Sequence, residues 1–223
     1  MVNILRRAFL VAVAAASFSL AGVVAPAHAE ADPEQAKALV QNLSRDAVKI
    51  MTSKTLNDTQ RIDQFRTLFI GSVDLPAVSK FILGRHWKTA SPQQQQDFMH
   101  LFEEMLVYTW ANRFKDASDN ITVAISGVKP DGEDGAIVDS SILRAGQEPI
   151  PVLWRLRQSD GGLKIIDLLI EGTSMIVTYR EEYASVINQS GGKIDGLLDV
   201  LRQKTVALAA AQTAKPGPGS NSN

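Results

Sequence analysis

Apolar residues recur at helical spacing between residues 33 and 114. Three of the segments follow a residue whose side chain can cap a helix, namely Asp32, Asp74 and Ser91. Pro92 and Gln94 complete a capping box with proline in the first turn. The pattern predicts helices over about 33–51, from 57 or 58 to 71, between 74 and 84, and over 92–114, with residues 85–90 as a connector.

The period changes from Asn120 onward, where apolar and polar residues begin to alternate. Gly, Pro and Asp residues separate the alternating runs at 130–132, 145–147 and 159–162. This pattern predicts four strands, over 121–125, 136–143, 150–157 and 163–170. Because the intervening turns are short, the strands should form an antiparallel meander.

The last predicted strand meets a sharp corner at Glu171-Gly172, after which the period becomes helical again. Thr173 or Ser174 can cap a helix that continues to about Ile187, and a final helix is expected over about 197–210. Helices, a meander and helices again indicate an α+β fold. We expect a curved four-stranded antiparallel sheet with the helices packed on one face.

The N-terminus has the three regions of a cleavable signal peptide. Arg6-Arg7 precede an apolar run, and Ala27-His28-Ala29 is a small-x-small cleavage site. We therefore expect residues 1–29 to be a signal peptide, 30–211 to be one domain, and 212–223, rich in Gly, Pro, Ser and Asn, to be a disordered tail. The mature protein should be soluble and periplasmic, while export by the general or the twin-arginine route stays open.

Composition excludes several classes of function. The net charge is −1 and becomes more negative when Arg6 and Arg7 are removed, so a nucleic-acid partner is not expected. Zero cysteines exclude disulfides, thiol catalysis and thiolate metal sites. The sequence has neither a GxGxxG nor a GxxxxGK[ST] motif, so no nucleotide cofactor is predicted.

Catalytic candidates are few. His86 lies in the predicted connector and His100 in the helix over 92–114. Two separate histidines make a poor metal-ligand set, so we expect no metal. Asp139 and Asp167 lie in the middle of apolar strands, where a carboxylate could act as a base. Each aspartate points to the opposite sheet face from the apolar residues beside it in the strand. This favours a solvent-facing or hydrogen-bonded aspartate. An enzyme acting on an apolar substrate stays an alternative.

The helix over 92–114 carries more apolar surface than one sheet face needs, because Val107, Tyr108 and Trp110 widen its stripe. This excess could fill a core or line an apolar ligand pocket. A structural or adaptor protein with a filled core is therefore a further alternative.

Several segments resemble a known family. These are Val73-Asp-Leu-Pro-Ala-Val78, Phe81-Ile-Leu-Gly-Arg-His-Trp87-Lys-Thr-Ala-Ser-Pro92, Phe98 with Phe102, Asp167-Leu-Leu-Ile-Glu-Gly-Thr-Ser-Met175, Arg180-Glu-Glu-Tyr183 and Asp195-Gly-Leu-Leu198. They are similar to the periplasmic lipid-binding component (MlaC) of the Mla/toluene-tolerance ABC transport system, and to the related hopanoid-associated HpnM proteins. The resemblance covers about residues 34–202, and Thr173 stands where Val or Ile is usual.

The resemblance implies an apolar pocket between sheet and helices that holds the acyl chains of a phospholipid, or a hopanoid, without catalysis or a cofactor. Its partners would be an outer-membrane lipid-transfer complex and an inner-membrane ABC transporter complex. At the corner, Leu168 and Met175 would face the lipid from two sides. The residues assigned to the pocket wall by strand parity and helix face are Phe81, Trp87, Phe102, Leu106, Tyr108, Ile142, Val152, Trp154, Leu156, Ile166, Leu168 and Met175. The number of chains, the direction of transport and the oligomeric state stay open.

Overall fold

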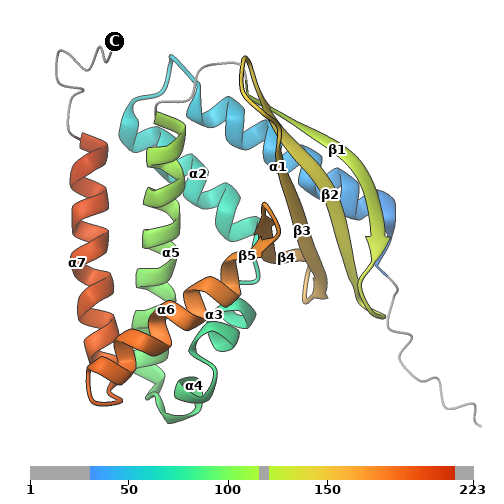
Figure 1. Cartoon of the computed structure of the whole chain (residues 1–223). Helices are drawn as coiled ribbons and strands as arrows, with labels where there is room; N and C mark the ends of the chain where they lie inside the picture. Colours follow the sequence, from blue (N-terminus) through green and yellow to red (C-terminus); the bar gives the residue numbers. More distant parts are fainter. Residues whose placement is uncertain (1–30, 116–120, 214–223) are drawn as a thin grey trace, which may run out of the picture.

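The computed structural model describes residues 31–115 and 121–213 (Figure 1). The predicted signal peptide, 1–29, and residues 214–223 of the predicted tail lie outside the described residues. Within the described ranges, no helix combines the length and apolar character needed to cross a membrane.

The predicted N-terminal helices are confirmed with their caps. They are α1 (Pro33–Met51), α2 (Asp58–Ser72), α3 (Leu75–Leu83) and α5 (Pro92–Lys115). The Asp32 carboxylate accepts a 2.9 Å hydrogen bond from the backbone N–H of Glu34, and the Asp74 carboxylate accepts one of 3.0 Å from Ala77. The predicted connector differs, because Arg85–Thr89 forms a short helix, α4. Gly84, with φ of 51°, turns the chain between α3 and α4.

The four predicted strands form an antiparallel meander, as expected. They are β1 (Ile121–Pro130), β2 (Gly135–Arg144), β3 (Ile150–Ser159) and β4 (Gly162–Ile170), and the sheet order is β1-β2-β3-β4-β5. The fifth strand, β5 (Thr173–Ser174), was not predicted, because a strand of two residues has no readable period. It pairs antiparallel with the end of β4.

The corner at Glu171-Gly172 is a two-residue hairpin turn between β4 and β5. Glu171 has φ of 51° and Gly172 has φ of 81°, and two positive φ values are the pattern of a type I′ turn. Helix α6 (Met175–Gln189) follows at once, with Ser174, one of the two expected residues, as its cap. The corner therefore leads from sheet to helix through a short strand.

Three clusters of buried apolar residues hold the elements together. The first joins α3, α5, α6 and α7 (Ile194–Thr213) around Phe98 and Leu198, and the second joins α1 to the sheet around Val40 and Val138. The third joins α1, α2 and α5 around Phe65. Figure 1 shows α5 and α7 side by side, away from the strands, while α1 runs along the sheet. The α+β architecture with its helices and sheet in separate layers is confirmed.

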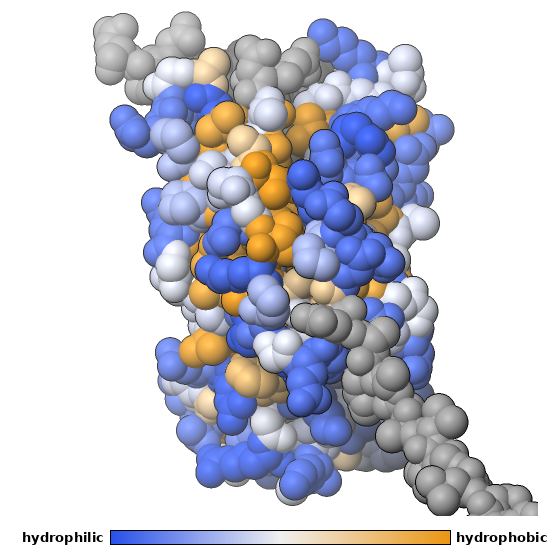
Figure 2. Space-filling model, turned by 90° about the vertical axis from the view of Figure 1, so that its right-hand side faces the viewer, coloured by the Kyte–Doolittle hydropathy of each residue, from blue (hydrophilic) through white to orange (hydrophobic). Residues whose placement is uncertain are grey.

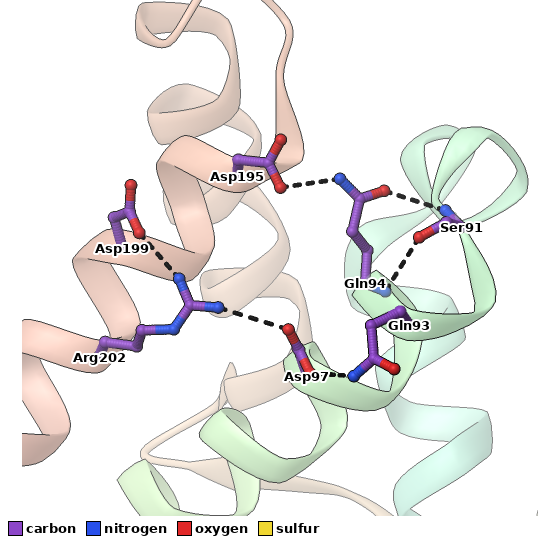
Figure 3. Close-up of polar contacts among 7 residues, drawn as sticks. All are labelled: Ser91, Gln93, Gln94, Asp97, Asp195, Asp199 and Arg202. Atoms are coloured by element: carbon purple, nitrogen blue, oxygen red, sulfur yellow. Dashed lines mark hydrogen bonds and ion pairs between the residues drawn. The ribbon is translucent and has the colours of Figure 1, made fainter.

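A polar network fixes the start of α5 to α7 (Figure 3). Ser91 and Gln94 form the predicted capping box, with bonds of 2.9 and 3.2 Å between side chain and backbone. The Gln94 amide also donates to Asp195 at 2.8 Å, and Arg202 on α7 lies 3.4 Å from Asp97 on α5. The cap of α5 thereby sets the position of α7 as well. Helix α7 ends at Thr213, two residues inside the segment expected to be the tail.

Candidate binding pocket

A cavity of about 320 Å³ lies between the sheet and helices α1, α2 and α5. Its lining is apolar except for Ser44 and Arg144. The apolar lining residues are Leu43, Ala47, Val48, Phe65, Phe69 and Trp110 from the helices, Val73 after α2, and Ile121, Val123, Ile142, Ile150, Val152, Trp154, Ile165, Leu168 and Ile170 from the sheet. Its volume lies at the lower end of the range for small-molecule pockets. The lining of the cavity favours an apolar ligand with a single polar end.

Strand register builds the sheet side of this cavity. Ile142 of β2 stands opposite Val123 of β1 and Ile150 of β3, which gives one row of apolar side chains across three strands. Trp154 of β3 stands opposite Leu168 of β4 and continues the wall. Directly opposed residues in neighbouring strands point to the same face of a sheet, so alternation in each strand suffices to make a continuous apolar surface.

Trp154 is held in the wall by its polar end. Its indole N–H donates a 2.8 Å hydrogen bond to the Ser140 hydroxyl, which in turn donates to the Val152 carbonyl oxygen at 3.0 Å. Ser140 is buried, so the polar atoms of this chain are satisfied inside the protein. The tryptophan therefore adds its apolar ring to the cavity surface without an unpaired N–H.

Arg144 is the only charged residue among those that line this cavity. It lies at the last position of β2, opposite Ile121 at the first position of β1, so it marks one end of the sheet. Its side chain is exposed and has no ion-pair partner among the described residues. Figure 2 shows that hydrophobic residues gather in a strip between hydrophilic ones on the side of the molecule where β1 lies. A ligand with an anionic end and an apolar body would match this combination of charge and apolar surface.

A second, smaller cavity of about 60 Å³ lies next to the first, between α3, α5, α6 and β4. The two cavities share five lining residues: Phe69, Val73, Trp110, Ile165 and Leu168. The residues that line only the second cavity are Val78, Phe102, Leu106, Ile166, Asp167, Met175, Ile176 and Tyr179. Both cavities thus belong to one apolar region that a shared wall divides.

The structure places eight of the twelve predicted wall residues on these cavities. Ile142, Val152 and Trp154 line the first, Leu168 lines both, and Phe102, Leu106, Ile166 and Met175 line the second. Leu168 and Met175 do approach the second cavity from the two sides of the corner. Ligand contact by these side chains stays a prediction.

The other four line neither of the two cavities. Leu156 is fully buried in the cluster between α1 and the sheet, and Trp87 packs against the helical cluster from α4. Phe81 is 40% exposed, with the Arg180 guanidinium 5.0 Å from its ring centre. Tyr108 lies under the guanidinium of Arg66, at 5.9 Å. Strand parity and helix face show which way a residue points, but not which element covers it. The assignment of these four residues to the pocket wall lacked that second piece of information.

The sequence assignment also missed the helical side of the first cavity. Leu43, Ala47, Phe65 and Phe69 line it from α1 and α2, whereas the wall predicted from the sequence includes no residue of these two helices. Trp110 was noted only as part of an apolar excess on α5. That excess was the signal available, because ligand pockets are lined mainly by apolar and aromatic side chains.

The two aspartates considered as bases have different environments. Asp139 is partly exposed, and its carboxylate lies 3.6 Å from the Lys129 ammonium. Asp167 is only 3% exposed, so the solvent-facing interpretation is wrong for it and the hydrogen-bonded one is confirmed. Asp167 stands opposite Arg155, on the other sheet face from Leu168. It is buried there because the start of α6 covers it, where the Ser174 hydroxyl and the Ile176 N–H donate to its two oxygens.

Among the described residues, the two histidines and Tyr183 lie in separate environments. The described residues contain no cluster of three His, Asp or Glu side chains that could hold a metal ion. His100 is exposed near Glu104, at 3.8 Å, and partial burial together with Arg85 lowers the pKa of His86. Burial, followed by the nearby Tyr179 and Glu182, raises the pKa of Tyr183. His86, His100 and Tyr183 line neither cavity.

Comparison with known proteins identifies relatives of this fold. The structure of the phospholipid-binding protein from Ralstonia solanacearum, in complex with a phospholipid, superposes with a TM-score of 0.70 and 26% identity over 78% of this chain and 98% of that one. The toluene tolerance protein ttg2D of Pseudomonas putida is 23% identical over 200 residues, which cover 89% of this chain and 90% of the relative.

A third relative is the intermembrane phospholipid transport system binding protein MlaC of Haemophilus influenzae. It is 27% identical over 135 residues, which cover 59% of this chain and 62% of the relative. The sequence model of the family described as MlaC protein matches residues 41–203. Membership in the hopanoid-associated branch stays a prediction. The family match extends from α1 through the sheet to α7, and the chain belongs to the MlaC family.

Proposed function

We propose that this protein binds a phospholipid, with its acyl chains in the cavity, and carries it between membranes. The observation that carries the proposal is the apolar cavity between sheet and helices, in a fold that a phospholipid-bound protein shares. Residues 30–211 would form the single lipid-binding domain.

The apolar lining suits a ligand whose acyl chains are costly to expose to water. Transfer of acyl chains into water costs about 0.8 kcal/mol per methylene, so a free lipid crosses an aqueous compartment slowly. The cavity offsets this cost through apolar contact alone, and no chemical step is needed. The paired carboxylate of Asp167 supports a carrier rather than an enzyme, because both of its oxygens already accept hydrogen bonds within the protein.

The headgroup would stay at the end of the sheet that Arg144 marks. An exposed guanidinium near an apolar cavity can attract a phosphate group and leave it hydrated. Contact with one phosphate oxygen does not distinguish headgroups, so we expect selection by the apolar part of the lipid. A hopanoid without a phosphate would lack this contact.

The carrier would act in the periplasm after removal of residues 1–29. It would exchange lipid with an outer-membrane lipid-transfer complex and an inner-membrane ABC transporter complex. The support is the family membership and the name of the Haemophilus relative, which is the binding protein of an intermembrane phospholipid transport system.

Native mass spectrometry of gently purified protein, followed by lipid extraction, tests the proposal. We expect a bound species of phospholipid mass; a hopanoid mass, or an apoprotein that takes up no lipid from vesicles, would contradict it. Ala47→Trp should fill part of the cavity and lower the bound fraction severalfold, because Ala47 lines it. Ala38→Trp is the matched control, since Ala38 is exposed on the same helix.

A further inference from the structure

Positive charge gathers where α3, α4 and α6 lie together, in the lower part of the molecule in Figure 1. Neither α3 nor α4 contains an Asp or Glu residue, and all their Lys and Arg side chains are exposed. Because the whole sequence has a net charge of −1, this end of the molecule differs in sign from the rest. The basic patch, as we call it, consists of Lys80, Arg85, Lys88 and Arg180.

Arg180 connects α6 to the patch and holds an aromatic ring at the surface. Its guanidinium lies 5.0 Å from the ring centre of Phe81 and donates a 3.3 Å hydrogen bond to the Phe81 carbonyl oxygen. The same guanidinium lies over Gly84, where an added Cβ atom would come within 3.1 Å of it. Phe81 nevertheless stays 40% exposed. The patch therefore displays an aromatic ring among its cations.

The charges of the patch are not neutralised within the described part of the chain. Its four side chains form no ion pair with any described residue, and Arg85 instead donates to the neighbouring His86 ring at 3.3 Å. Most other described arginines do pair with an Asp or Glu side chain, namely Arg45, Arg61, Arg66, Arg155, Arg157 and Arg202. Exposed cations without such partners attract an anionic one.

Carboxylates border the patch without cancelling its charge. Glu181 is exposed next to Arg180 in α6. Glu182 lies 3.5 Å from Lys204 of α7, and Asp74 caps the far end of α3. The patch therefore keeps an excess of positive charge.

The combination of side chains favours a bilayer as the anionic partner. Proteins that bind anionic membranes place Lys and Arg at the lipid phosphates and an aromatic or aliphatic side chain in the interface. Val177, 42% exposed and one turn before Arg180, adds an aliphatic side chain. No residue of the basic patch lines either cavity, so the patch is a separate surface. An acidic protein segment would match the charges but gives no role to the exposed Phe81 ring.

We propose that the basic patch, with Phe81 among its cations, binds the anionic headgroups of a phospholipid bilayer. The cations would contact lipid phosphates, and the Phe81 ring would enter the interface. Each Lys or Arg close to an anionic bilayer strengthens binding about fivefold. This goes beyond the proposed function, because the patch would bring the protein to a membrane whatever the cavity holds.

Sedimentation of the mature protein with vesicles tests the proposal. At low salt, vesicles that contain phosphatidylglycerol should bind it at least about tenfold more tightly than vesicles of phosphatidylcholine alone. The difference should shrink as salt is added. Equal binding to both kinds of vesicle would overturn the proposal.

A double variant locates the binding surface. Lys80→Glu with Arg85→Glu should weaken binding to the anionic vesicles about tenfold or more, because repulsion replaces the attraction of two cations. Lys37→Glu with Lys49→Glu is the matched control, since both lysines are exposed on α1, which lies away from α4 in Figure 1. An equal loss in the two double variants would show that only net charge matters, against the proposal.

Two single variants test the ring and the border of the patch. Phe81→Ser should weaken binding severalfold at low and at high salt, because salt does not screen apolar contact. Glu181→Gln removes a repelling carboxylate and should strengthen binding severalfold. Circular dichroism establishes that each variant is folded. Folded variants that both bind as the wild type does would contradict the proposal.

Two further measurements separate this proposal from its alternatives. A wild type that binds no vesicles, but binds a polyglutamate peptide through Lys80 and Arg85, would identify an acidic protein segment as the partner and overturn the proposal. Native mass spectrometry reports the lipid in the cavity separately. The Lys80→Glu, Arg85→Glu protein should hold as much lipid as the wild type, since neither residue lines a cavity. Vesicle binding by a wild type that holds no lipid would support the patch and refute only the proposed function.

Discussion

The Ser174 hydroxyl donates a 2.6 Å hydrogen bond to one carboxylate oxygen of Asp167, across the corner between β4 and α6. The other oxygen accepts from the backbone N–H of Ile176, at 3.2 Å, in the first turn of the helix. The Ser174 hydroxyl also accepts a 3.3 Å hydrogen bond from the N–H of Val177. One carboxylate and one hydroxyl therefore provide acceptors for backbone N–H groups in the first turn of the helix. A negative charge at a helix N-terminus is electrostatically favourable as well.

Replacement of Asp167 by alanine should lower the free energy of unfolding by about 3 kcal/mol, because it leaves two partly buried donors without an acceptor. Urea denaturation measures this loss. Asp139→Ala is the control, since its exposed ion pair with Lys129 contributes about 1 kcal/mol or less. A double-mutant cycle with Ser174→Ala should give a coupling of about 1–3 kcal/mol. An Asp167→Ala protein as stable as the control would show that the contact does not hold the corner.

The same substitution at two positions of one strand face should have opposite consequences. Trp154 is partly buried and lines the first cavity, so Trp154→Arg should leave a folded protein that retains no lipid. Leu156 has no exposed surface and lies in the core, so Leu156→Arg should prevent stable folding, because it buries an unpaired charge.

Circular dichroism and mass spectrometry of extracted lipid distinguish these outcomes. A folded Leu156→Arg protein that only fails to bind lipid would return Leu156 to the pocket wall, as the strand parity first indicated. Lipid loading that is unchanged in Trp154→Arg would remove Trp154 from it.

Reversal of the charge near the first cavity should slow lipid uptake. Arg144→Glu is expected to lower the uptake rate from phosphatidylglycerol vesicles severalfold at low salt, because it replaces attraction by repulsion. The difference should shrink as salt is added. Arg157→Glu is the matched control: Arg157 pairs with Gly135 at the opposite end of β2 and lies 3.4 Å from Asp134. Equal effects of the two variants would mean that only the net charge matters.

Tyr183→Phe should preserve or raise stability at neutral pH. The Tyr183 hydroxyl is buried without a hydrogen-bond partner among the described residues, while its ring packs edge-on against Phe98 and Phe102. Phenylalanine keeps the packing and removes the unpaired group, which we expect to add about 1 kcal/mol. A loss of that size in urea denaturation at pH 7 would reveal a partner for the hydroxyl.

The same variant should change the response to alkaline pH. Burial raises the pKa of Tyr183 in the folded state, so above pH 10 the unfolded chain loses this proton while the folded chain keeps it. The wild type therefore loses stability as pH rises past 10, and Tyr183→Phe should lose less. Unfolding curves at pH 9 and pH 11 measure the difference between the two proteins.

Local signals predicted most of the fold. Cap residues such as Asp32 and Ser91 located helix starts to within a residue, because capping depends only on neighbouring residues. Alternation located the four long strands and the apolar residues Ile142, Val152 and Trp154 that now line the first cavity. These features depend on a few consecutive residues, which the sequence displays directly.

The local patterns do not show relationships between distant segments. Asp167 is buried because the start of α6 covers its carboxylate, and no pattern within β4 shows which element covers a residue. Leu156 shares a strand face with Trp154, but it lies in the cluster that α1 forms with the sheet. Ala47 and Phe65 belong to a buried apolar cluster and also line the first cavity, and periodicity does not distinguish these two environments. How the helices cross the sheet decides each case.

The positions of the tryptophans give the protein its own optical reporter of occupancy. Of its three tryptophans, Trp154 lines the first cavity and Trp110 lines both, whereas Trp87 on α4 lies on neither. Indole emission shifts to shorter wavelength when water leaves its surroundings, and a brominated or spin-labelled acyl chain quenches it on contact. Trp87 can serve as an internal reference for the other two. Lipid loading could thus be followed in real time by fluorescence, without an attached dye.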